Sequence, residues 1–213
     1  MIDLIYCYDS RKFQEIAIEC KWLYGVKLPG TVYFDDLYFS DQDWKKPDKE
    51  RYINAVKEYR PHMATVLDLE KESQFDEVIE WAECIAPYVN ILIIIPKVSG
   101  MIQKLPKRIN SKEIRLGYSV PTSYAGTKVM FLEFCGWPIH LLGGHPTKQM
   151  GLITYLDVKS ADCNQHTIAA KWGKHWANKK YQDPIAQNAM YEMFRLSCTN
   201  IYNAWMKMSP ERH

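Results

Sequence analysis

Short apolar runs rich in branched residues alternate along this chain with segments whose apolar residues recur at helical spacing. Such alternation is typical of strands joined by helices, and it predicts parallel strands with helical crossovers. The run at 90–98, which reads NILIIIPKV, is apolar enough to be buried on both faces. Seven strands are expected in all, at residues 4–7, 31–36, 63–69, 90–98, 114–120, 138–144 and 157–162.

Helices are expected between these strands. Ser10 is suited to cap the first helix and Gly25 to end it, and Pro61 ends the second. The predicted α/β fold is a compact (βα) barrel of TIM type with one degenerate or missing unit and a C-terminal helix, or else an open doubly wound sheet. A single domain over residues 1–213 is expected from the length. The predicted helices lie at 12–25, 48–60, 74–86, 164–176 and 183–208.

Composition indicates which partners and which cellular compartment to expect. The 27 basic and 25 acidic residues give a net charge of +2, so any contact with nucleic acid must come from a local patch. The six cysteines show no paired spacing, which favours reduced thiols in the cytoplasm, or in the host cytoplasm if the protein is viral. No apolar run approaches the roughly 20 residues that span a bilayer, so no membrane partner is expected.

Polar residues and glycines gather where the predicted strands end. In parallel α/β folds ligands bind at the carboxyl ends of the strands, although any single Asp or Asn there can simply cap the next helix. Lys97 is placed to pair with an acid or a phosphate, or to extend into solvent. The residues concerned are Asp35, Asp36, Asp68, Lys97, Gly143, Gly144, Asp162 and Asn164.

Asp162 is the strongest candidate for a catalytic residue. It follows an apolar strand and lies between Ala161 and Cys163, so its carboxylate is expected in a crowded, partly dry site as a nucleophile or base. Strand alternation allows only one of Asp35 and Asp36 to face the barrel axis. Convergent carboxylates suit glycosyl transfer, and they suit magnesium binding equally well.

Several common sites are missing from the sequence. His140, His145 and His166 form no HExxH motif, and no Cys and His cluster has zinc-finger spacing. The glycine-rich nucleotide motifs and the GxSxG elbow are also absent. We therefore expect neither a cofactor nor a bound metal.

Several strand ends, read in order, resemble those of the tRNA-guanine transglycosylases. That family has a His-Leu-Met-Gly-Val-Gly-like strand, then a helix containing proline, then a Phe-Asp-Cys motif whose Asp is the nucleophile. Here HLLGG, HPTKQMGLITYL and SADCN stand in the same order, and the resemblance spans most of the chain through short motifs. The runs that carry it are VYFDD, ATVLDLE, IIIPKVSG, IRLGYSVPT and PIHLLGGHPTKQMGLITYLDVKSADCN.

The resemblance implies roles for the acids. Asp162 matches the nucleophile that displaces guanine and bonds to the sugar C1′. Asp35 or Asp36 would be the general base for the incoming base, although the family's Ser-Gly-Gly-Phe-Gln does not follow them. Asp68 would hold the Watson–Crick edge of the purine.

It also implies a set of substrate-binding residues around those acids. The sequence GYS, Gly117 to Ser119 with Tyr118 between them, stands where the family has a Gly-Gly-Leu-Ala loop, and Lys97 replaces a Gln or Gly. The other residues expected to bind substrate are Asp68, Gly143, Gly144 and Asn164.

The chain lacks the zinc-binding Cys-x-Cys-x-x-Cys of the tRNA enzymes and so most resembles the small phage-type and bacterial DNA-guanine transglycosylases. The resemblance implies that the partners are DNA, with a flipped-out or single-stranded guanine, and a 7-deazaguanine base such as 7-cyano-7-deazaguanine. A homodimer is left open. The basic residues expected to contact phosphates, each equally able to face solvent, are Lys107, Arg108, Lys171 and Lys174.

Two other functions remain as alternatives. One is a metal-dependent hydrolase or lyase acting on a small phosphorylated substrate, with the acids on magnesium and Lys97 on the phosphate. The other is a non-catalytic barrel that binds nucleic acid or a partner enzyme.

Overall fold

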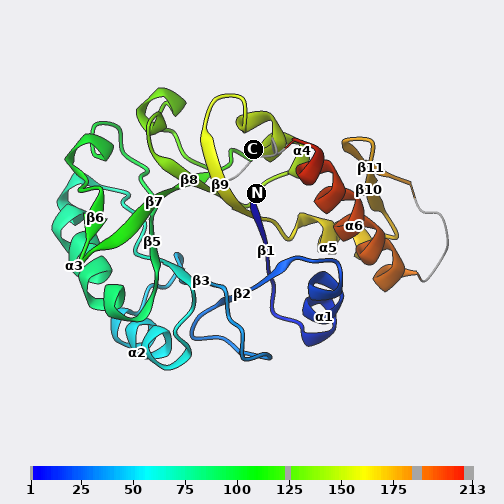
Figure 1. Ribbon diagram of the computed structural model, residues 1–213, viewed down its shortest axis with the longest axis horizontal. Coiled ribbons are helices and arrows are strands. Elements are labelled where there is room, and N and C mark those ends of the chain that lie inside the picture. Colours follow the sequence, from blue (N-terminus) through cyan, green and yellow to red (C-terminus); the bar gives the residue numbers. More distant parts are fainter. Residues whose placement is uncertain (1, 123–125, 184–188, 209–213) are drawn as a thin grey trace.

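Eight parallel strands form a closed barrel in the computed structural model, which describes residues 2–122, 126–183 and 189–208 (Figure 1). Each strand pairs with the next along the chain, and β9 pairs with β1 to complete the ring. The predicted TIM-type barrel is therefore confirmed. Its strands are β1 (Asp3–Cys7), β2 (Leu23–Lys27), β3 (Phe39–Asp41), β4 (Met63–Thr65), β5 (Ile91–Ile94), β7 (Lys112–Ser119), β8 (Pro138–Leu142) and β9 (Asp157–Asp162).

Helices surround this ring, and α6 lies across one side of it near the β10–β11 hairpin (Figure 1). Within the described residues, the connections that follow β2, β5 and β7 contain no α-helix. The short strand β6 (Arg108–Ile109) pairs antiparallel with the start of β7. The remaining elements are α1 (Arg11–Glu19), α2 (Lys49–Tyr59), α3 (Phe75–Ile85), α4 (Pro146–Leu152), α5 (Gln165–Lys171), β10 (His175–Ala177), β11 (Lys180–Gln182) and α6 (Met190–Met208).

The barrel interior is a packed core and not a pore. Branched and aromatic side chains fill it, among them Ile5, Phe39 and Ile93, and a separate, larger cluster packs between the outer faces of the strands and the helices. At Gly117 a Cβ atom would lie 2.6 Å from Ile95 Cγ1, so only glycine leaves room for these neighbours. Filling the interior in this way leaves the carboxyl end of the barrel as the place for a pocket.

The structure corrects the predicted elements between residues 12 and 36. The first helix ends at Glu19, because Lys21 takes a left-handed conformation with φ of 69°, and Leu23–Lys27 forms β2 in place of the helix's second half. Residues 31–36 form no strand, and Asp35 and Asp36 are exposed there. The third strand is Phe39–Asp41, so the ring has eight strands with none missing.

Two further predictions concern the last third of the chain. The helix predicted at 164–176 ends at Lys171 and is followed by β10, while the one predicted at 183–208 begins at Met190. Residues 184–188 of that second prediction lie outside the described residues. No helix in the described part of the chain combines the length and the apolar character needed to cross a membrane.

Candidate active site

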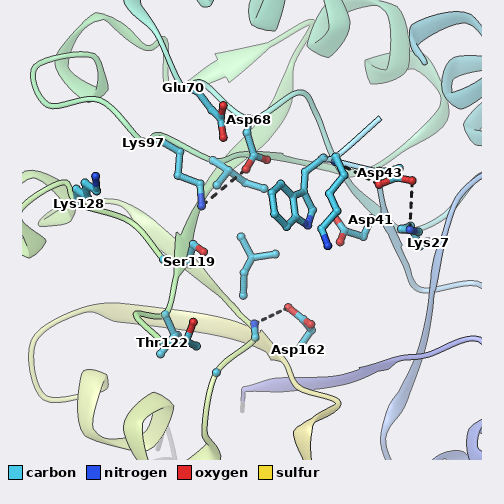
Figure 2. A pocket seen from close by; sticks show the side chains of 18 residues that line it. Lys27, Asp41, Asp43, Asp68, Glu70, Lys97, Ser119, Thr122, Lys128 and Asp162 are labelled. Carbon is cyan, nitrogen blue, oxygen red and sulfur yellow. Dashed lines mark hydrogen bonds and ion pairs between the residues drawn. The ribbon is translucent and has the colours of Figure 1, made fainter. Parts of the chain in front are cut away.

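A pocket of about 810 Å³ opens at the carboxyl ends of the barrel strands (Figure 2). It is formed where β3, β5, β7, β8 and β9 end, together with the loop after β4, so residues far apart in the sequence share one space. A cavity of this size is typical of ligand sites. Its polar lining consists mainly of Lys27, Asp41, Asp43, Lys45, Asp68, Glu70, Lys97, Ser119, Lys128 and Asp162.

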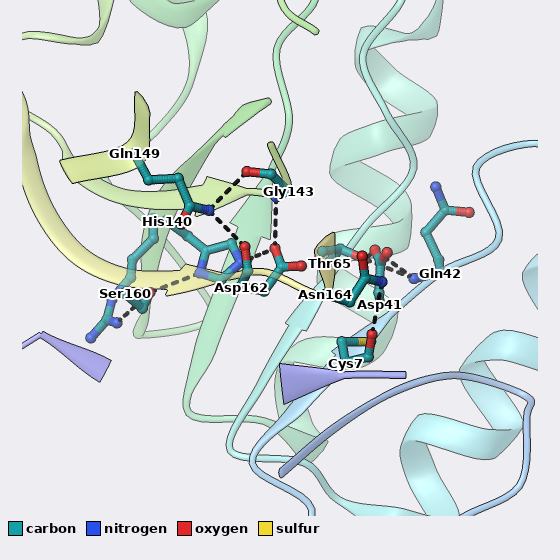
Figure 3. Close-up of polar contacts among 11 residues, drawn as sticks. Cys7, Asp41, Gln42, Thr65, His140, Gly143, Gln149, Ser160, Asp162 and Asn164 are labelled. Atoms are coloured by element: carbon teal, nitrogen blue, oxygen red, sulfur yellow. Dashed lines mark hydrogen bonds and ion pairs between the residues drawn. The ribbon is translucent and has the colours of Figure 1, made fainter. Parts of the chain in front are cut away.

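Asp162 is the last residue of β9 and lines this pocket. Its Oδ1 accepts a hydrogen bond of 3.3 Å from the backbone N–H of Gly143, and His140 Nε2 lies 3.4 Å from the same oxygen (Figure 3). Gln149 donates to the carbonyl oxygens of both Asp162 and Gly143, at 2.7 and 2.8 Å. The carboxylate is thus held on one oxygen by groups from the strand beside it.

Asp41 closes β3 and faces the same pocket. Its Oδ1 accepts hydrogen bonds from Thr65 Oγ1 at 3.0 Å and from the backbone N–H of Gln42 at 2.9 Å. Burial, and then the negative charge of Asp162, raise the pKa of Asp41 to about 7. At neutral pH this carboxyl group can therefore both give and take a proton.

Asp68 and Lys97 form an ion pair at the pocket, with 3.7 Å between Lys97 Nζ and Asp68 Oδ2 (Figure 2). Burial raises the pKa of Asp68 to about 6, and the positive charge of Lys97 opposes that rise. Asp68 is therefore mostly ionised at neutral pH. The pair offers a hydrogen-bond acceptor and a donor side by side, which suits recognition of a polar ring edge.

The pocket mouth carries lysines and an exposed aromatic ring. Lys27 pairs with Asp43 at 3.4 Å, and Lys45 lies 5.3 Å from the centre of the Trp44 ring. Trp44 is 52 % exposed, and Lys128 is exposed as well. A flat ring beside cations is suited to stacking and to phosphate contact.

Three of the predicted substrate-binding positions besides Asp68 and Lys97 also line the pocket: Ser119, Gly143 and Gly144. Gly143 and Gly144 both have positive φ, at 60° and 81°, and a Cβ atom on Gly144 would lie 2.7 Å from Val120 Cγ1. The turn after β8 therefore requires glycine.

The other three predicted substrate-binding residues lie elsewhere. Gly117 is buried inside the barrel, where it makes room for its neighbours. Tyr118 points to the outer face and packs edge-on against Phe134, since adjacent strand residues face opposite sides. Asn164 uses its side chain to donate to the backbone oxygen of Cys7, which ties the end of β9 to β1 (Figure 3).

The expectation that Asp35 or Asp36 is catalytic is corrected in the same way. Both lie in the exposed loop after β2, outside the pocket, and the pocket acids from this part of the chain are Asp41 and Asp43. Asp41 was not predicted because two of the three residues of its strand, Ser40 and Asp41, are polar, so the strand leaves no apolar run. The aromatic pair Tyr38 and Phe39 just before Asp41 was the available signal.

Two of the residues expected to contact phosphates lie at the end of the barrel opposite the pocket. Lys107 and Arg108 lie beside the amino end of β7, where Lys107 Nζ sits 3.3 Å from the centre of the Trp137 ring and Arg108 donates to the backbone oxygen of Ser111. They therefore lie far from the pocket, at the opposite end of the strands.

The remaining two predicted phosphate contacts have local partners. Lys171 donates to the Tyr8 hydroxyl at 2.8 Å, and Lys174 lies 3.8 Å from Asp183. Across the described ranges, no group of three His, Cys, Asp or Glu side chains is placed to hold a metal ion.

The chain belongs to a family of unknown function (DUF6610), whose model matches residues 31–206. None of the curated proteins matches it. The matched region begins after β2 and includes Asp41, Asp68 and Asp162.

Proposed function

We propose that the protein is a glycosyltransferase that exchanges guanine in DNA for a 7-deazaguanine, such as 7-cyano-7-deazaguanine. The observation that carries this proposal is a pair of carboxyl groups in one pocket with different surroundings. Asp162 is held by a backbone N–H, while burial and the charge of Asp162 raise the pKa of Asp41 to about 7. Such a pair can supply a nucleophile and a proton donor together.

In the first step Asp162 bonds to the sugar C1′ while the bond from C1′ to guanine N9 breaks. Protonated Asp41 gives its proton to the departing base, so the base leaves as a neutral molecule. In the second step the incoming 7-deazaguanine returns a proton to Asp41 as its own ring nitrogen attacks C1′. Asp162 is then released as a carboxylate, and both acids return to their starting state.

In this proposal Asp68 and Lys97 recognise the base. Guanine and 7-cyano-7-deazaguanine share an edge with an N–H, an amino group and a carbonyl oxygen. The Asp68 carboxylate can accept from the N–H groups, while Lys97, 3.7 Å from it, can donate to the carbonyl oxygen.

A base inside a duplex must leave the stack to reach such a pocket. Trp44 at the mouth is placed to stack on a neighbouring base, and Lys45 and Lys128 to contact phosphates. We therefore expect single-stranded DNA to be used at least as well as duplex DNA.

The test is to incubate the protein with DNA and 7-cyano-7-deazaguanine, digest the DNA to nucleosides and measure their masses. We expect the modified deoxynucleoside, and a protein–DNA adduct that survives denaturation. Parallel reactions with RNA and with a chelator separate this proposal from an RNA enzyme and from a metal-dependent one. Absence of both the nucleoside and the adduct would contradict the proposal.

A further inference from the structure

A chain of polar side chains runs through the barrel interior from its amino end to Asp162. Arg115 on β7 donates to Ser160 Oγ at 3.2 Å, and Ser160 Oγ lies 2.9 Å from His140 Nδ1. The other ring nitrogen of His140 faces Asp162 Oδ1 at 3.4 Å (Figure 3). Three neighbouring strands thus carry a continuous connection to the proposed nucleophile.

Strand register explains why these groups meet. Ser160 and Asp162 are two residues apart on β9 and so face the same side, and His140 on β8 lies opposite Ser160. The His140 ring is fully buried and packs 5.0 Å from the Phe39 ring. Its Nε2 has no hydrogen-bond partner of good geometry among the described residues, which leaves the nearby carboxylate as the polar group it faces.

The donors and acceptors determine the direction of the hydrogen bonds between Arg115 and Asp162. A guanidinium can only donate, so Ser160 Oγ accepts from Arg115; its own O–H can then donate to His140 Nδ1, or its second lone pair can accept from Nδ1–H. The Asp162 carboxylate, 3.4 Å from Nε2, favours the tautomer that carries the ring proton on Nε2. The opposite tautomer would set the lone pair of Nε2 against a carboxylate, which is repulsive.

We propose that Arg115, Ser160 and His140 position the Asp162 carboxylate for reaction. The Nε2–H of His140 and the N–H of Gly143 both hold Oδ1, which leaves Oδ2 as the oxygen that bonds to C1′. At 3.4 Å the contact from His140 is longer than an ordinary hydrogen bond, so Gly143 and His140 act on Oδ1 together. His140 is a positioning residue, and its effect on rate rests on the proposed function.

The first test needs no activity. In protein labelled with ¹⁵N at histidine, the ring-nitrogen shifts report which nitrogen carries hydrogen, and the His140 signals are identified by their loss in His140→Gln. We expect hydrogen on Nε2 and an unprotonated, hydrogen-bonded Nδ1. Hydrogen on Nδ1 would overturn the inference, whatever reaction the protein catalyses.

The second test is kinetic. His140→Leu should lower kcat about 10²-fold and leave KM within about twofold, because substrate still binds but only the Gly143 N–H then orients the carboxylate. His140→Gln, whose amide can donate to Asp162, should recover most of that loss. His166→Leu removes another fully buried histidine, packed among Tyr6, Trp22 and Phe194, and should leave kcat unchanged.

The outcomes separate the two proposals. Full activity in His140→Leu, with base exchange seen in the wild type, would overturn the positioning role and leave the proposed function intact. No exchange in the wild type would overturn the proposed function, and the ¹⁵N measurement would still decide the direction of the hydrogen bonds. If His140→Leu fails to fold, Ser160→Ala takes its place and should lower kcat several-fold with KM unchanged.

Discussion

The two ends of the barrel interior differ in how their charged groups are paired: opposite charges meet at the amino end, and two acids share a pocket at the carboxyl end. Near the amino end, Arg115 lies 3.6 Å from Asp3 and 3.2 Å from Glu113, and the Tyr38 hydroxyl donates to Asp3 at 2.7 Å. At the carboxyl end Asp41 and Asp162 face a common pocket, and the charge of Asp162 helps to raise the pKa of Asp41.

The difference shows that charged groups at the two ends contribute to stability in opposite directions. A partly buried charge with partners on several strands stabilises the ring, and loss of one partner leaves the others unpaired. A carboxyl group whose pKa is raised by burial and by a neighbouring carboxylate, as in Asp41, lowers stability at neutral pH, and such groups are typical of functional sites. Mutations at the two ends should therefore have different effects.

The largest expected effect is at Asp162. Asp162→Asn keeps an acceptor for the Gly143 N–H but cannot form the bond to C1′, so base exchange should fall by at least about 10³-fold. The melting temperature should stay within about 2 °C of the wild type. Asp36→Asn, in the exposed loop, is the matched control and should retain full activity. An active Asp162→Asn protein would show that the nucleophile lies elsewhere.

Asp41 should give the next largest effect. With its pKa raised to about 7, the wild-type rate of guanine release should decline as pH rises through 7, because the proton donor is lost. Asp41→Asn should slow release about 10²-fold and remove this decline. Single-turnover rates measured across this pH range test both points, and an unchanged profile in the variant would assign the titration to another group.

Arg115 should affect stability. Arg115→Met leaves Asp3 and Ser160 without their shared partner, so the free energy of unfolding in urea should fall by about 2–3 kcal/mol. Lys128→Met removes a cation at the pocket mouth and should change the free energy of unfolding by less than about 0.5 kcal/mol. If both variants lost the same free energy of unfolding, the amino and carboxyl ends of the barrel would not differ in their contribution to stability.

The smallest effect is the pH dependence of stability. An unfolded Asp has a pKa near 3.9, so between about pH 4 and 7 folded Asp41 keeps a proton that the unfolded chain has lost. The contribution of Asp41 to the free energy of unfolding should therefore be greatest below about pH 4 and decline as pH rises to about 7. Asp68, with its pKa raised to about 6, contributes a decline in the same direction. Asp41→Asn should reduce the decline and be roughly 2 kcal/mol more stable at pH 8. Urea titrations at both pH values test this.

The sequence predicted the barrel where its strands lie in runs of apolar residues. The run at 90–98 contains β5, and the run at 138–144 contains β8, because branched side chains buried on both faces leave a clear pattern. β2 and β3 left no such pattern. Gly25 interrupts β2 where the barrel has no room for a side chain, and β3 is three residues long.

The pocket residues were predictable only where they follow a strand that the sequence pattern had shown. Asp162, Asp68 and Lys97 follow strands that the pattern showed, and all three line the pocket. Asp41 was missed together with its strand. The pKa of Asp41 depends on the distance to Asp162, and no local pattern in a single sequence records which distant acids become neighbours.

The amide of Gln149 on α4 joins the carbonyl oxygens of Gly143 and Asp162, and so fastens two neighbouring loops to one short helix. We therefore expect the two loops to keep their arrangement only when both are present together with α4. A protein engineer who wished to change the specificity of this scaffold could replace the loops after β3 or β5 one at a time. The β8 and β9 loops, with α4 between them, would have to be transplanted together.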